Sequence, residues 1–84
     1  MKDPHDVFAE FLAKQGGRYT ASKRQISDEV FHLSDHFEVE NFIDHLRAKY
    51  DRVARATVYR TIKQLLDAGL LQKISTRDGK VYYE

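Results

Sequence analysis

The chain has 84 residues and a formal net charge of +1, from 14 Lys and Arg against 13 Asp and Glu. Its 42% hydrophobic content and single Pro exclude a disordered or collagen-like chain and predict one small domain with a single core. Cys is absent, which excludes disulfides, thiolate zinc sites and cysteine nucleophiles, and no apolar run reaches the roughly 18 residues that span a bilayer. We expect one cytoplasmic domain over residues 1–84 with no membrane contact.

The first predicted helix begins at Asp3-Pro4, because Asp accepts free amide groups of a first turn and Pro is preorganised there. Gly16-Gly17 ends it. One apolar stripe follows from the helical spacing of Val7, Phe8, Phe11 and Leu12.

A second helix is predicted from Thr20 or Ser22 to Leu33, and Ser34-Asp35 ends it. Its apolar face contains Ile26, Val30, Phe31 and Leu33. A third helix ends at Asp51-Arg52 and repeats the same pattern. Its apolar face contains Val39, Phe42, Ile43, Leu46 and Tyr50.

The fourth predicted helix covers residues 55–68, and Gly69 ends it in the left-handed conformation. Val58, Ile62, Leu65 and Leu66 share its inner face. The outer side carries Arg55, Tyr59, Arg60 and Lys63. Two strand-like runs follow, residues 70–75 and 80–83, and the Asp78-Gly79 pair between them predicts a β-hairpin.

This order of elements predicts a fold that is mainly α with a small β-hairpin. Four helices followed by a two-stranded hairpin is the layout of a winged helix-turn-helix, with the hairpin as the wing. The third and fourth helices would form the helix-turn-helix, and the fourth would enter a DNA major groove.

The net charge hides an uneven distribution. Residues 49–63 contribute +4, and Arg18, Lys23 and Arg24 contribute +3, whereas the acidic residues between positions 28 and 44 contribute −6. Binding to phosphate depends on local rather than total charge, so the basic segments favour DNA. We expect the acidic stretch to point away from the DNA.

Tyr59 and Arg60 are the predicted recognition pair. They lie about 100° apart on the outer side of the fourth helix. At this position Tyr can contact thymine methyl groups and phosphate, and Arg can bind guanine or phosphate through its planar fork.

Several segments resemble the amino-terminal DNA-binding domain of ferric uptake regulator (Fur) family repressors. The most specific is Ala56-Thr57-Val58-Tyr59-Arg60-Thr61-Ile62. The others are Arg18-Tyr19-Thr20-Ala21-Ser22-Lys23 with Ile26, Asp67-Ala68-Gly69-Leu70, and Gly79-Lys80-Val81-Tyr82-Tyr83-Glu84. They occur in the family's order and cover nearly the whole chain.

The resemblance implies a metal-responsive repressor that binds A/T-rich palindromic operators on double-stranded DNA as a homodimer. Tyr59 and Arg60 would contact the major groove, and Arg18 a narrow A/T minor groove, where negative potential is concentrated. The other expected DNA-binding residues are Thr57, Arg55 and Lys63 on the fourth helix and Arg77 and Lys80 on the wing, with Lys73 as a further phosphate contact.

The sequence departs from the family pattern near the helix-turn-helix. Ala54 and Glu38 stand where helix-capping Ser or Thr are common, and Lys23 replaces an Arg. Arg55 stands where an apolar residue is frequent, which predicts slightly higher affinity for DNA of any sequence.

His36 and Glu84 match positions that help to bind the regulatory ion in Fur-like proteins. An imidazole and a carboxylate suit Fe(II), Zn(II) or Mn(II) but are too few to hold an ion firmly. We therefore expect no cofactor on this chain alone and one of these ions in a longer regulator. His5, His32 and His45 are expected to be surface histidines.

The family's dimerisation domain and Cys-x-x-Cys motif are absent, so the chain is expected to be the excised half of a longer regulator that dimerises through the missing half. A minimal protein without metal control is the alternative. For function, the rival is a winged-helix module that docks other proteins without DNA specificity. An enzyme is not expected, since no nucleophile has an activating partner.

Overall fold

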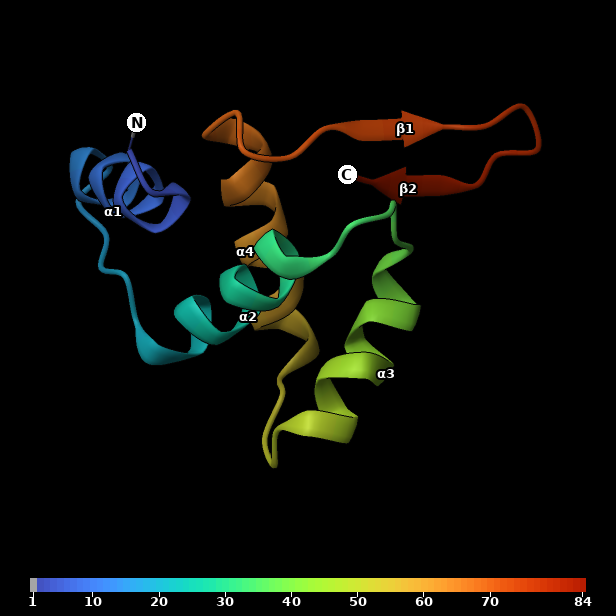
Figure 1. Ribbon diagram of the computed structural model, residues 1–84, viewed down its shortest axis with the longest axis horizontal. Coiled ribbons are helices and arrows are strands. Elements are labelled where there is room, and N and C mark those ends of the chain that lie inside the picture. Colours follow the sequence, from blue (N-terminus) through green and yellow to red (C-terminus); the bar gives the residue numbers. More distant parts are fainter. Residues whose placement is uncertain (1) are drawn as a thin grey trace.

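The computed structural model describes residues 2–84, in which four helices are followed by an antiparallel hairpin (Figure 1). The elements are α1 (Pro4–Lys14), α2 (Ala21–His32), α3 (Val39–Lys49), α4 (Arg55–Asp67), β1 (Lys73–Ser75) and β2 (Val81–Tyr83). The predicted fold class is confirmed. No helix in the described part of the chain is long and apolar enough to cross a membrane.

The first strand is shorter than predicted because the residues before it close α4. Gly69 has a φ of 78°, and the Leu70 amide donates to the carbonyl of Leu65 at 2.9 Å. Leu71 then lies in the core. Antiparallel pairing begins only after Leu71, where Gln72 exchanges two backbone hydrogen bonds with Glu84 at 2.7 and 3.0 Å, so the predicted start of the strand at residue 70 is wrong.

Local caps explain where the first two helices begin. The side chain of Asp3 accepts from the His5 amide at 2.8 Å, and that of Thr20 accepts from the Lys23 amide at 3.2 Å. Glu38 and Ala54, at the starts of α3 and α4, make no side-chain cap. The helix-turn-helix therefore depends on burial of its apolar faces rather than on capping.

The core lies between the helices, with α4 packed against α2 and α3 (Figure 1). The residues buried in it are Phe8, Leu12, Ile26, Val30, Val39, Phe42, Ile43, Leu46, Val58, Ile62, Leu65 and Leu71. Thr61 is also fully buried, which the apolar pattern did not predict. Its hydroxyl donates to the carbonyl of Thr57 at 2.7 Å, so its polar atom is satisfied within the helix.

The wing, defined here as β1, β2 and the turn between them, is tied to the helix-turn-helix. β1 and β2 pair with Lys73 opposite Tyr83 and Ser75 opposite Val81. On the other side of β2, Tyr83 exchanges two backbone hydrogen bonds with Phe37, at 2.8 and 2.9 Å. This long-range pairing lies in the α2–α3 connection and was not predicted.

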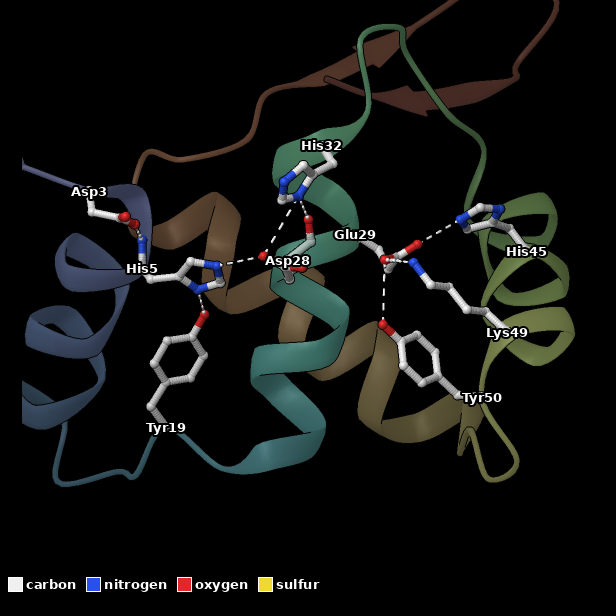
Figure 2. A network of polar contacts seen from close by, with 9 residues as sticks. All are labelled: Asp3, His5, Tyr19, Asp28, Glu29, His32, His45, Lys49 and Tyr50. Atoms are coloured by element: carbon white, nitrogen blue, oxygen red, sulfur yellow. Dashed lines mark hydrogen bonds and ion pairs between the residues drawn. The ribbon is translucent and has the colours of Figure 1, made fainter.

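The side chain of His5 connects α1 to α2 (Figure 2). Its Nδ1 lies 2.6 Å from the Tyr19 hydroxyl, and its Nε2 lies 3.0 Å from Oδ1 of Asp28. The side chain is only 17% exposed. The expectation of a surface histidine was wrong at this position, because the apolar stripe of α1 brings its first turn against α2.

A second polar network connects α2 to α3 through Glu29 (Figure 2). Its carboxylate receives hydrogen bonds from Lys49 Nζ at 2.9 Å and Tyr50 Oη at 3.4 Å, and it pairs with His45 Nε2 at 2.8 Å. The Glu29 side chain is only 9% exposed. The hydrogen bond from Lys49, followed by that from His45, lowers the pKa of Glu29 despite its burial.

This carboxylate predicts a pH-dependent contribution to stability. Because its pKa is lowered by folding, the contribution is present above the ordinary glutamate pKa of about 4.5 and is lost as the pH falls through the folded pKa. Glu29→Gln should lower the melting temperature at pH 7 by about 4–8 °C, the equivalent of about 1 kcal/mol in a domain of this size.

Thermal unfolding followed by circular dichroism at pH 7 and pH 3 tests this prediction. The gap between wild type and Glu29→Gln should be smaller at pH 3 than at pH 7, because the lowered pKa of Glu29 makes its contribution fall with the pH. Asp44→Asn is the matched control, since it removes the same charge from an exposed position on α3. A gap of equal size at both pH values would contradict the proposed linkage.

Candidate nucleic-acid interface

The outer face of α4 presents one aromatic and three basic side chains. Arg55, Tyr59 and Lys63 are spaced four residues apart and form a stripe along the helix, and Arg60 lies beside Tyr59. Val58, on the opposite face, is fully buried, whereas Tyr59 is 45% exposed. The predicted inward and outward faces of this helix are confirmed.

Glu40, in the first turn of α3, lies against this stripe. One of its carboxylate oxygens accepts a hydrogen bond from the Tyr59 hydroxyl at 2.6 Å, and the other pairs with the guanidinium of Arg55. The expectation that the whole acidic stretch points away from the recognition surface was therefore wrong. The α3–α4 packing brings one of its carboxylates onto that surface.

The contact changes the titration of all three groups. The hydrogen bond from Arg55, followed by that from Tyr59, lowers the pKa of Glu40. The hydrogen bond to Glu40 in turn raises the pKa of Arg55 and the pKa of Tyr59. Glu40 is thus ionised and Tyr59 protonated at neutral pH, which keeps an acceptor and two donors in place.

A groove separates α4 from the wing on this side of the molecule. Its volume is about 270 Å³. The residues that line it are Glu38, Val39, Glu40, Tyr59, Lys73, Val81 and Tyr83. Tyr59 and Glu40 therefore lie at the junction of both parts of the helix-turn-helix and the wing.

The remaining predicted DNA-binding residues lie on the flanks of α4. Arg18 is exposed in the α1–α2 loop, and Arg77 and Lys80 are exposed in the wing turn. The loop and the turn lie at opposite ends of the long axis, which measures 37 Å (Figure 1). Thr57 is half-buried beside the turn before α4, so it is the least accessible of the predicted set.

His36 and Glu84 are brought together by the pairing of Phe37 with Tyr83, because the residues next to an antiparallel pair lie opposite each other. Both are exposed, and the His36 ring packs edge-on against Tyr82. The two side-chain types suit a divalent ion. Residues 2–84 contain no group of three or more His, Cys, Asp or Glu side chains that could hold a metal.

The sequence did not predict Glu40 on the face of α4 that carries Arg55 and Tyr59. No local spacing connects position 40 to positions 55 and 59, since the contact depends on how α3 crosses α4. The charge of Arg55 indicates this contact in part. A charged residue in place of an apolar one beside a helix-turn-helix requires water or a counter-charge, so it favours a nearby carboxylate.

The fold and the α4 surface define the class of the protein as a winged helix-turn-helix domain. Comparison with protein families is consistent with this class, since the model of the ferric uptake regulator family matches residues 14–84. The chain belongs to the ferric uptake regulator family.

Relatives of known description support the assignment. The chain is 31% identical to a ferric uptake regulation protein of Rhizobium leguminosarum bv. viciae, over 100% of this chain and 59% of that protein. It is 28% identical to a zinc uptake regulation protein of Mycobacterium tuberculosis, over 86% of this chain and 55% of that protein. The chain thus spans little more than half the length of these relatives.

Solved structures of uptake regulators also superimpose on this chain. A manganese uptake regulator superimposes with a TM-score of 0.74 at 31% identity and covers 92% of this chain, which in turn covers 57% of that structure. The Helicobacter pylori ferric uptake regulator Fur superimposes with a TM-score of 0.79 over 99% of this chain and 57% of its own. Its 15% identity supports the fold alone.

Proposed function

We propose that this domain binds double-stranded DNA as the operator-reading part of a metal-responsive repressor. The observation that carries the proposal is the outer face of α4, where the exposed Tyr59 stands among Arg55, Arg60 and Lys63 while the opposite face is buried. A helix with one buried side and one basic, aromatic side is suited to the major groove.

In this proposal some α4 side chains contact bases and others contact the phosphate backbone. Tyr59 contacts thymine methyl groups through its ring, and Arg60 forks onto guanine or phosphate. Lys63, further along the same stripe, contacts the phosphates, and Arg55 adds a further phosphate contact where it leaves Glu40. Thr57 supports the first turn of α4 from its half-buried position, and its carbonyl holds the hydroxyl of Thr61.

The flanking residues extend the contact along the duplex. Arg18 enters an adjacent narrow A/T minor groove, and Arg77, Lys80 and Lys73 of the wing meet the phosphates. The 37 Å length of the domain is close to one turn of B-DNA, about 34–36 Å, so both flanks can engage one site. The target is an A/T-rich palindrome, each half read by one subunit of a homodimer formed through residues outside this chain.

A divalent ion is proposed as the signal of the longer regulator. His36 and Glu84 supply two donors for Fe(II), Zn(II) or Mn(II), and residues outside this chain complete the site. Relatives named for iron, zinc and manganese uptake support an ion of this class. The ion would supply a link between the domain and the rest of the regulator.

The test is a fluorescence anisotropy titration of the 84-residue chain on an A/T-rich palindromic duplex and on a scrambled duplex of equal composition. With about four phosphate contacts, affinity should fall about 100-fold between 50 and 200 mM salt. The palindrome should bind more tightly than the scrambled duplex. Added Mn(II) should leave both affinities unchanged, because this chain supplies only two ligands.

The rival function makes the opposite prediction. A winged-helix module that docks proteins would use Tyr59 and the wing aromatics as an apolar contact surface. It would show no duplex binding, or weak binding without a preference for the palindrome. Either result would contradict the proposed function.

A further inference from the structure

One carboxylate lies on the surface that the proposed function assigns to DNA. Glu40 accepts from the Tyr59 hydroxyl at 2.6 Å with one oxygen and pairs with Arg55 through the other. The side chains of Arg55 and Glu40 are 51% and 48% exposed. An approaching duplex would therefore meet this contact at the surface rather than in the core.

The carboxylate takes the donors that a phosphate would take. Carboxylate and phosphate oxygens are both strong acceptors for guanidinium and hydroxyl groups. In the free domain Glu40 satisfies both donors with its two oxygens, so neither is available to the DNA backbone until it leaves Glu40. The negative charge also repels a phosphate placed near Arg55.

We propose that Glu40 is a specificity-determining residue, which competes with the DNA backbone for Arg55 and Tyr59 and so weakens binding to arbitrary DNA more than binding to the operator. This inference rests on the proposed DNA-binding function. Glu40 is a positioning residue, since it acts through Arg55 and Tyr59 and contacts no base itself.

The difference between the two kinds of DNA follows from what each requires of Tyr59. Binding to arbitrary DNA is made almost entirely of phosphate contacts, which compete with Glu40 for the Tyr59 hydroxyl and the Arg55 guanidinium. Reading a thymine methyl group uses the apolar edge of the ring. In the operator complex Glu40 keeps the hydroxyl and Arg55 and holds the ring in place, while Arg60 contributes independently.

The test compares wild type with Glu40→Gln on the palindromic and scrambled duplexes. We expect the substitution to raise affinity for the scrambled duplex about three- to tenfold and to change affinity for the palindrome less than about twofold. The slope of log affinity against log salt on the scrambled duplex should steepen by up to about 0.9, because Arg55 gains one phosphate contact.

Glu38→Gln is the matched control. Glu38 lines the same groove and carries the same charge, and its side chain caps no helix and makes no bond to α4 within residues 2–84. Its substitution should change both affinities by a similar small factor. A second control repeats Glu40→Gln in an Arg55→Ala, Tyr59→Phe background, where the effect on the scrambled duplex and on the salt slope should disappear.

Three outcomes would overturn the inference while leaving the proposed function intact. These are an equal gain on both duplexes, a gain from Glu38→Gln as large and as selective as that from Glu40→Gln, and a gain that persists in the Arg55→Ala, Tyr59→Phe background. Failure of the wild-type chain to bind either duplex would contradict the DNA-binding function itself.

Discussion

The chain carrying Tyr59→Ala and Arg60→Ala is expected to lose at least about 30-fold of its affinity for the A/T-rich palindrome, because each base-reading side chain contributes about 1–3 kcal/mol. Both side chains are exposed, so the loss should occur without a change of fold. Anisotropy titration measures the affinity, and circular dichroism checks that the melting temperature stays within about 2 °C of wild type.

Conservative substitutions separate base reading from charge. Arg60→Lys keeps the charge but loses the planar fork, so it should preserve binding to the scrambled duplex and weaken preference for the palindrome. Tyr59→Phe keeps the ring that contacts a thymine methyl group and should retain most of the palindrome affinity. An unchanged palindrome affinity in the double Ala variant would contradict the assignment of α4 as the reading helix.

Phe8→Ala is expected to destabilise the domain by about 3–5 kcal/mol, a large share of the roughly 5–15 kcal/mol that holds a domain together. Phe8 is 0% exposed, and its ring packs edge-on against Tyr19 at 5.2 Å. This result would show that α1, most of which precedes the segment matched by the family model, belongs to the same folding unit.

Urea denaturation measures this loss through the midpoint and slope of the transition. Phe11→Ala is the matched control, since Phe11 has the same side chain on the same helix but is only partly buried. It should cost less than half as much. A loss below about 1 kcal/mol for Phe8→Ala, with the slope unchanged, would mean that α1 is an appendage rather than part of the core.

The sequence predicted the features that arise from neighbouring residues. Asp3, Thr20 and Gly69 act within a turn of where they stand, so the helix ends that depend on them could be predicted from spacing alone. The buried and exposed faces of α4 follow in the same way from its periodicity.

Contacts between distant segments could not be predicted. His5 joins Tyr19 and Asp28, and Glu40 joins Arg55 and Tyr59, only because of the angles at which the helices cross. The pattern of charges along the chain gives signs and counts but not directions in space. The charge pattern therefore predicts an acidic stretch wholly away from the outer face of α4, although Glu40 lies against that face.

The pairing of Phe37 with Tyr83 also reduces the conformational entropy that the domain loses when it binds. Because Tyr83 is held between Phe37 on one side and Lys73 on the other, the wing is anchored at the start of α3 before any ligand arrives. The conformational entropy of anchoring the base of the wing beside α4 is thus lost during folding and not again during association. In the proposed complex the wing and α4 would meet the duplex as a prearranged pair.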